Sequence, residues 1–126
     1  MDSNRPAPKF LNLFRIALPP GGIASIAHRV SGVLMFLAVP LLAWLFALSL
    51  QSEQGFQTAL GELRSLPGRL LSLVLVWSLS HHFLAGLRHL LLDMEIGMHR
   101  THARASAWVV NVGALVVTAL YLLSLL

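Results

Sequence analysis

One stripe of polar and small residues interrupts an otherwise apolar segment of the chain. His82, Gly86, His89 and Asp93 follow one another at intervals of four, three and four residues. On an α-helix these steps leave all four positions within about 40° of one another, because each residue turns the helix by about 100°. An imidazole in an apolar helix, with a glycine one turn along, is typical of a metal ligand beside room for a flat group. We therefore expect His82 to ligate a haem iron.

A second polar stripe precedes it in the chain. Ser25, His28, Arg29 and Gly32 occupy positions i, i+3, i+4 and i+7, which again share one helix face. The first helix would enter the membrane from the cytoplasm, and the second would return to the cytoplasm. The polar face of the first helix then lies at about the same depth as His89. The two stripes are then expected to meet.

The composition is that of a membrane protein. Hydrophobic residues make up 56% of the 126 positions and charged residues 11%, with a mean hydropathy of +0.75. Uncharged runs at 30–50, 70–87 and 105–126 can each supply the roughly 20 residues that cross a hydrocarbon core. We predict an all-α integral membrane protein with three transmembrane helices. It has an N-terminal cytoplasmic or interfacial segment at 1–24 and a three-helix transmembrane domain at 25–126, with helices near 25–50, 68–93 and 104–126.

Basic residues predict the orientation of these helices. Seven of the nine Lys and Arg residues lie in the N-terminal part and the start of the first span, at the end of the second span, or in and directly after the loop at 94–103. By the positive-inside rule these parts face the cytoplasm, and the C-terminus is periplasmic in a multi-pass inner-membrane protein. The basic residues are dispersed, which gives no sign of a nucleic-acid site. The absence of cysteine excludes a thiolate or iron–sulfur site in this chain.

Other ionisable residues have less specific interpretations. His81 is rotated by about 100° from His82 on a helix, so both cannot address one iron, and we expect it to pack between helices or face lipid. Arg88 points away from the His82 stripe and is expected to snorkel or to form a structural salt bridge. His99 and His102 lie in a polar loop, where a solvated histidine is the default.

Taken together, the two stripes resemble one known family. The segments SIAHRVSG at 25–32 and HFLAGLRHLLLD at 82–93 occur in the order found in the cytochrome b membrane-anchor subunits of succinate dehydrogenase, respiratory complex II. The resemblance extends over nearly the whole chain and includes an early Arg-Pro pair. It departs at 7–10, where the family often has Ser-Pro-His and this chain has Ala-Pro-Lys-Phe.

The resemblance implies a division of roles among residues and subunits. His82 would be one axial ligand of haem b, with the second axial histidine supplied by a partner anchor subunit. The chain would then be part of a haem-binding heteromeric helical bundle. Ser25 and Arg29 would line the ubiquinone site beside the iron–sulfur subunit, passing electrons from that subunit to the quinone. The residues near the haem propionates would be His28, His89, Arg88 and Asp93. The residues that pack against the haem would be Gly86 and Gly32. A flavoprotein subunit would complete the enzyme, and no catalytic residue is assigned to this chain.

The assigned side chains suit quinone chemistry. The carbonyl oxygens of a quinone become negative on reduction, and a hydroxyl donor with a fixed cation stabilises that charge. Three alternatives are left open. The chain could anchor a fumarate reductase that oxidises quinol, or it could be a purely structural anchor. It could also be a proton or ion transporter component that uses His28, Arg29, His82 and His89 as a relay.

Overall fold

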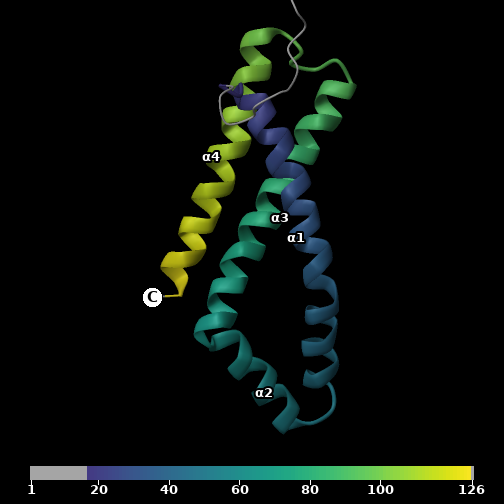
Figure 1. The fold of residues 1–126 in the computed structure, drawn as a ribbon, viewed down its shortest axis with the longest axis vertical. Helices are drawn as coiled ribbons and strands as arrows, with labels where there is room; N and C mark the ends of the chain where they lie inside the picture. Colours follow the sequence, from purple (N-terminus) through teal and green to yellow (C-terminus); the bar gives the residue numbers. More distant parts are fainter. Residues whose placement is uncertain (1–16, 126) are drawn as a thin grey trace, which may run out of the picture.

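The computed structural model describes residues 17–125, which fold into four helices without a strand (Figure 1). The helices are α1 (Pro20–Ser49), α2 (Glu53–Arg64), α3 (Leu66–Asp93) and α4 (Arg100–Ser124). Most of the N-terminal segment expected at 1–24, including the early Arg-Pro pair, lies outside the described residues. The part of that segment from Pro20 onward is helical and belongs to α1.

The three long helices confirm the prediction of three apolar elements of spanning length. They contain 30, 28 and 25 residues, against the roughly 20 that a hydrocarbon core requires. α1 begins five residues before the expected start, because Pro20 occupies its first turn. A proline is tolerated at this position because the N–H groups of a first helical turn have no hydrogen-bond partner within the helix, and because the fixed φ of proline is already helical. A Pro-Gly segment that could indicate an irregular chain therefore starts a helix.

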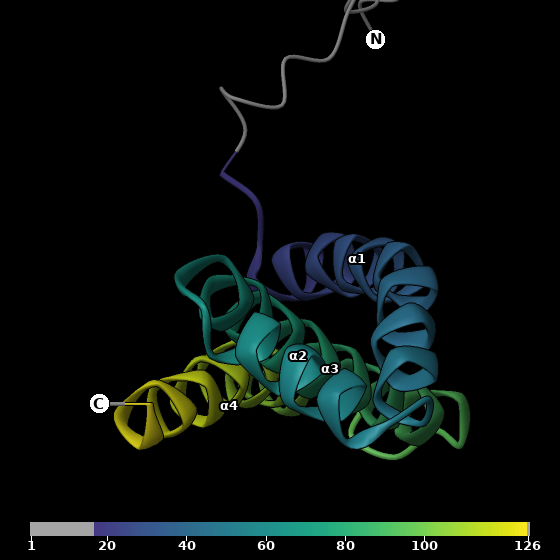
Figure 2. The same cartoon turned by 90° about the horizontal axis from the view of Figure 1, so that it is seen from below.

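The connection between the first two spans contains a helix that the sequence did not predict. Ser52 caps α2, because its Oγ accepts a hydrogen bond from the Gly55 N–H at 3.0 Å. Ser65 ends α2 and caps α3 in the same way, with Oγ 3.2 Å from the Gly68 nitrogen. A Cβ at Gly68 would overlap the Glu62 carbonyl, so this sharp turn between two helices requires a glycine. Figure 2 shows α2 lying across one end of the long helices.

α3 packs against both α1 and α4, and α1 also contacts the start of α4 (Figures 1 and 2). The buried positions of α1 recur every seven residues, a period typical of helices that cross at about 20°. Most buried residues are small, which lets helix backbones approach closely in a membrane. They are Ala24, Ser31, Ala38 and Leu45 of α1; Ser78, His81 and Ala85 of α3; and Ala107, Val110 and Ala114 of α4.

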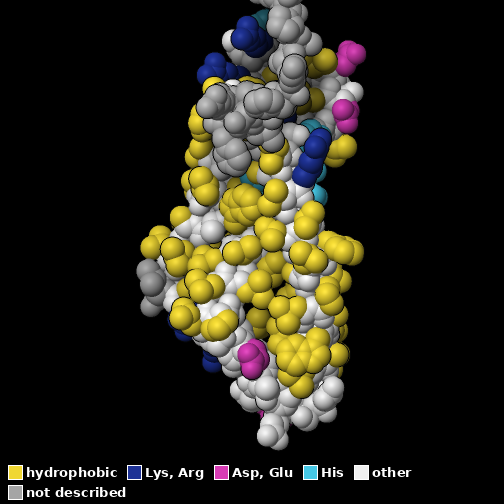
Figure 3. Space-filling model, viewed as in Figure 1, with side chains coloured by type: hydrophobic (Ala, Val, Ile, Leu, Met, Phe, Trp, Pro, Cys, Tyr) yellow, Lys and Arg dark blue, Asp and Glu magenta, His cyan; other side chains and the backbone are white. Residues whose placement is uncertain are grey.

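The large apolar side chains lie outside this core. Phe36 is 75% exposed and Phe83 67% exposed, and hydrophobic side chains cover most of the face drawn in Figure 3. Lysine and arginine side chains in that view lie toward the two ends of the molecule. This distribution is what lipid contact along the middle of the helices requires.

One asparagine joins all three long helices. The Asn111 Nδ2 group of α4 donates to the Pro20 carbonyl at the start of α1, at 3.4 Å. Its Oδ1 is then free to accept from His81 Nε2 of α3, at 3.1 Å. His81 is only 1% exposed, so of its two expected environments the structure confirms packing between helices.

Candidate functional site

The two polar stripes meet between α1 and α3. The rings of His28 and His82 stack with their centroids 4.1 Å apart and their planes inclined by 18°. His89, two turns farther along α3, places its ring edge-on to His28 at 5.0 Å. His28, His82 and His89 are called the histidine cluster below.

Glycines on both helices make this close approach possible. A Cβ added to Gly32 of α1 would lie 3.1 Å from Cε1 of His82, which is tighter than an ordinary contact. A Cβ added to Gly86 of α3 would lie 3.8 Å from Nε2 of His28. Each of these two rings therefore lies against a glycine of the opposite helix. We expected both glycines to make room for haem; in this structure both face imidazole rings.

The surroundings of His82 indicate which ring nitrogen carries the proton. Nδ1 lies 3.2 Å from the His28 carbonyl oxygen and 3.3 Å from the Ser31 hydroxyl oxygen. A carbonyl only accepts, and Ser31 gives its own proton to that carbonyl at 2.8 Å. We therefore infer that Nδ1 is the protonated nitrogen and that Nε2 of the neutral ring carries the lone pair.

His82 also lines an apolar groove between α1 and α3. The groove has a volume of about 460 Å³, and its other walls include Met35, Phe36, Leu42 and Leu79. Within residues 17–125 no hydrogen bond uses Nε2 of His82, since both of its ring contacts are made through Nδ1. A ligating histidine typically donates its other N–H to a backbone carbonyl, and His82 does so.

The donor set fits a haem better than a bare metal ion. Among the described residues, no group of three or more His, Cys, Asp or Glu side chains could hold a metal ion. A haem brings four nitrogen ligands of its own and needs from the protein only axial donors and an apolar surrounding. One histidine in an apolar groove would supply one of the two axial donors.

The remaining predicted residues lie around this cluster or away from it. Ser25 is half-buried on the cluster face of α1, whereas Arg29 is exposed, and Asp93 is exposed at the end of α3. Arg88 turns toward α4, where Nε donates to Ser106 Oγ at 3.0 Å. Its second guanidinium nitrogen donates to the Ala103 carbonyl at 3.1 Å, so its partners are neutral groups of α4.

Two residues with structural roles at this site carried no role in the sequence interpretation. Ser31 is fully buried and contacts Nδ1 of His82, but a serine three residues after His28 gives no sign of a cross-helix partner. Asn111 did carry a signal, because a lone amide in the apolar run at 105–126 needs a hydrogen-bonding partner. That partner is His81, which explains why His81 is polar without belonging to the histidine cluster.

Comparison with known proteins identifies the family of this chain. A family model described as succinate dehydrogenase/fumarate reductase transmembrane subunit matches residues 1–121. The chain is 32% identical over 120 residues to the succinate dehydrogenase cytochrome b556 subunit of Paracoccus denitrificans, covering 95% of this chain and 91% of the relative. The subunit of the same name from Coxiella burnetii is 32% identical over 111 residues, or 86% of this chain and 88% of the relative. That of Rickettsia felis is 26% identical over 118 residues, with 94% and 90% covered.

Proposed function

The chain belongs to the succinate dehydrogenase/fumarate reductase transmembrane-subunit family, and from this premise we propose that it is the cytochrome b anchor of a succinate dehydrogenase. As a transmembrane subunit with three long apolar helices, it is a multi-pass membrane protein. The proposed role is to hold haem b together with a second anchor subunit and to form part of a ubiquinone site. The iron–sulfur and flavoprotein subunits would complete the electron path from succinate.

The observation that carries this proposal is the state of His82. Its Nδ1–H is held by the His28 carbonyl and the Ser31 hydroxyl, and the ring lines an apolar groove. This arrangement fixes the ring orientation and leaves Nε2 as the atom that would bind the haem iron. Haem b held by this histidine and one from a partner subunit would supply a one-electron carrier.

His28 and His89 suit the polar edge of such a group. The His28 ring stacks on His82 and meets His89 edge-on, and His89 lies two turns from His82 toward the end of α3 that carries Asp93. Imidazole N–H groups at this depth can donate to propionate oxygens, whereas the groove residues on the other side of His82 are apolar. The site is therefore polar on one side of His82 and apolar on the other, which suits a haem with charged propionates at one edge and an apolar ring.

Ser25 and Arg29 are proposed to bind the quinone. They lie one helical turn apart at the start of α1, and the exposed Arg29 leaves its guanidinium open to a neighbouring subunit. The Ser25 hydroxyl would donate a hydrogen bond to a carbonyl oxygen, and Arg29 would offset the negative charge that develops on reduction. Because Arg29 is exposed in this chain, a partner subunit must supply the other wall of the site.

The test measures quinone reduction separately from succinate oxidation. In assembled complexes, Ser25→Ala and Arg29→Leu should each lower the rate of succinate-driven quinone reduction by roughly 10-fold or more. Reduction of an artificial acceptor that takes electrons before the quinone should stay near normal. Ser49→Ala and Arg64→Leu, at the other end of the molecule, are the matched controls. An unchanged ratio of the two activities in both test variants would contradict the quinone assignment.

A further inference from the structure

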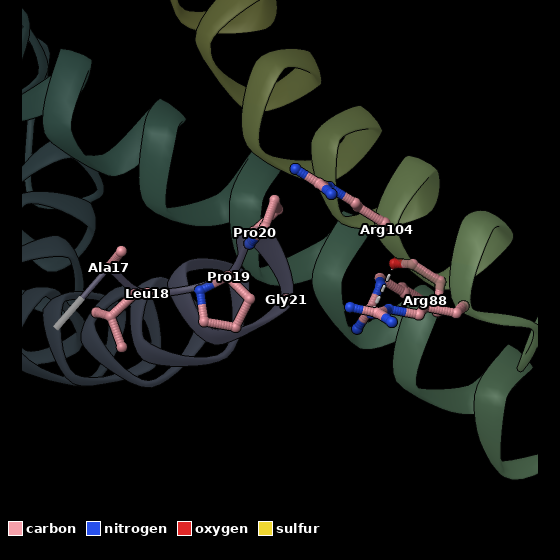
Figure 4. A pocket seen from close by; sticks show the side chains of 9 residues that line it. Ala17, Leu18, Pro19, Pro20, Gly21, Arg88 and Arg104 are labelled. Carbon is pink, nitrogen blue, oxygen red and sulfur yellow. Dashed lines mark hydrogen bonds between the residues drawn. The ribbon is translucent and has the colours of Figure 1, made fainter.

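A second cavity lies between the start of α1 and the start of α4. It has a volume of about 440 Å³ and is bordered by the starts of α1 and α4 and by Arg88 of α3 (Figure 4). Three arginines line it, Arg88, Arg100 and Arg104, and none of the described residues lining it is acidic. We call it the arginine pocket. It shares no lining residue with the groove at His82.

The helix ends add to the positive charge of this pocket. α1 and α4 both begin here, and neither first turn contains an acidic residue or a side-chain cap. The unpaired N–H groups at a helix start carry partial positive charge and attract anions. Arg100 and Arg104, in the first two turns of α4, therefore stand where a cation is unfavourable unless an anion lies nearby.

Arg88 is positioned for an anion by neutral partners. Its Nε and one terminal nitrogen are held by Ser106 and the Ala103 carbonyl, which satisfy donors without neutralising the charge. The same guanidinium lies 3.7 Å from the Cβ position of Gly21, at the wall that α1 contributes. A fixed guanidinium presents its donors in the planar arrangement that binds phosphate oxygens in pairs.

The depth and the neighbouring surface favour a lipid as the source of the phosphate. α1 is 30 residues long, or about 45 Å, so its ends extend beyond a hydrocarbon core of about 30 Å into the headgroup region. Trp108 and Leu115 lie within about 40° of Arg104 around α4 and are 52% and 60% exposed. An exposed tryptophan at this depth is typical of the membrane interface, and the leucine below it offers an apolar path for an acyl chain.

We propose that the arginine pocket binds the phosphodiester headgroup of an anionic membrane lipid, with the acyl chains along the exposed face of α4. The test changes Arg100 and Arg104, which have no role in the proposed haem and quinone sites, and leaves Arg88 unchanged, so it does not depend on those sites. An acidic segment of a partner protein and free inorganic phosphate are the competing occupants that the test must distinguish.

The experiment uses the complete complex, depleted of native lipid in phosphatidylcholine nanodiscs and titrated with phosphatidylglycerol. Bound lipid is counted by native mass spectrometry. The double variant Arg100→Gln, Arg104→Gln should bind phosphatidylglycerol roughly 10-fold or more weakly, since each basic residue near a charged membrane surface contributes measurably. Arg64→Gln, Arg69→Gln removes two arginines at the opposite end and should leave the affinity unchanged. Arg100→Lys, Arg104→Lys keeps the charge and should retain most of the affinity.

Several results would overturn the proposal. Equal affinity in the Gln variant and the wild type excludes the pocket, and equal binding of phosphatidylcholine excludes an anion-specific site. Displacement of phosphatidylglycerol by an equal concentration of inorganic phosphate identifies a free anion as the ligand. Unchanged lipid affinity with loss of another subunit identifies an acidic protein partner. If the Arg100→Gln, Arg104→Gln variant fails to assemble, Arg104→Gln alone should also weaken phosphatidylglycerol binding, by a smaller factor.

Discussion

His81 and His82 are neighbours in the chain, yet their environments fix opposite tautomers. His81 meets the Asn111 Oδ1 acceptor through Nε2, which must therefore carry its proton. His82 meets the His28 carbonyl through Nδ1, which leaves the lone pair on Nε2. A rotation of about 100° between adjacent residues is enough to send one ring toward α4 and the other toward α1.

This difference leads to the first prediction. His82→Ala should abolish or severely perturb the low-spin b-type haem spectrum, because an alanine has no atom that can ligate iron. His81→Ala should keep that spectrum for each assembled complex, although the lost bond to Asn111 weakens the contact between α3 and α4. Reduced-minus-oxidised spectra of the purified complexes measure both. A normal spectrum and midpoint potential in His82→Ala would exclude this histidine as the ligand.

The second prediction concerns Ser31. Ser31→Ala removes one of the two oxygens beside Nδ1 of His82 and should reduce haem retention by roughly 10-fold. This is the lower end of the loss observed when a ligating histidine loses a hydrogen-bonding partner. Retention is measured as haem per complex after extended detergent dialysis. Ser78→Ala is the matched control, because Ser78 is equally buried on α3 and its hydroxyl has no partner within the described residues. Equal retention in the two variants would rule out a role for the Ser31 hydroxyl.

At the scale of helices, the third prediction compares the two glycines of the interface. A methyl group at Gly32 would press on a ring that stacking and hydrogen bonds hold in place, and we expect Gly32→Ala to destabilise the complex by about 1–3 kcal/mol. A methyl at Gly86 would make only an ordinary contact at 3.8 Å with His28, so Gly86→Ala should be neutral or slightly stabilising. Thermal inactivation of the two variants gives the comparison. Greater sensitivity at Gly86 than at Gly32 would contradict the packing described here.

Composition alone was enough to predict the three long helices and the all-α membrane fold. Twenty or more consecutive apolar residues have few stable arrangements other than a spanning helix. α2 was missed because its sequence is mixed and short, and its caps at Ser52 and Ser65 are visible only once the turns around them are known. The start of α1 was placed too late because Pro-Gly residues indicate a turn as readily as a first helical turn.

The meeting of the two stripes was also predictable, since spacing fixes a helix face and topology fixes depth. Spacing could not reveal which ring lies against which glycine, because that depends on the relative rotation and sliding of α1 and α3. Sequence spacing also could not predict the hydrogen bond from Arg88 to Ser106, because that contact depends on how α3 and α4 cross. The sequence therefore predicted that His28, His82 and His89 gather between α1 and α3, but not that Arg29 and Asp93 stay exposed, nor the hydrogen bonds that hold the cluster.

At the scale of the whole molecule, the fourth prediction is the orientation in the membrane. A reporter fused before Met1 or inserted near His99 should be cytoplasmic, and one fused after Leu126 should be on the opposite side, because seven of nine basic residues lie toward the first side. Compartment-specific protease or labelling assays measure this. Reporters at the two termini that respond from the same compartment would exclude three membrane crossings.

The small side chains of the core also affect how much freedom the chain loses when its helices associate. Alanine loses no rotamer entropy on burial, whereas a leucine loses roughly 0.5–1 kcal/mol and a methionine more. The buried residues here are mostly alanine and serine, and the leucines and phenylalanines largely face outward. Bringing the helices together therefore orders few side chains, and those facing lipid keep their rotamer motions on the picosecond to nanosecond scale. The half-buried rings of the histidine cluster thus lie beside a core whose side chains lose little rotamer entropy when the helices associate.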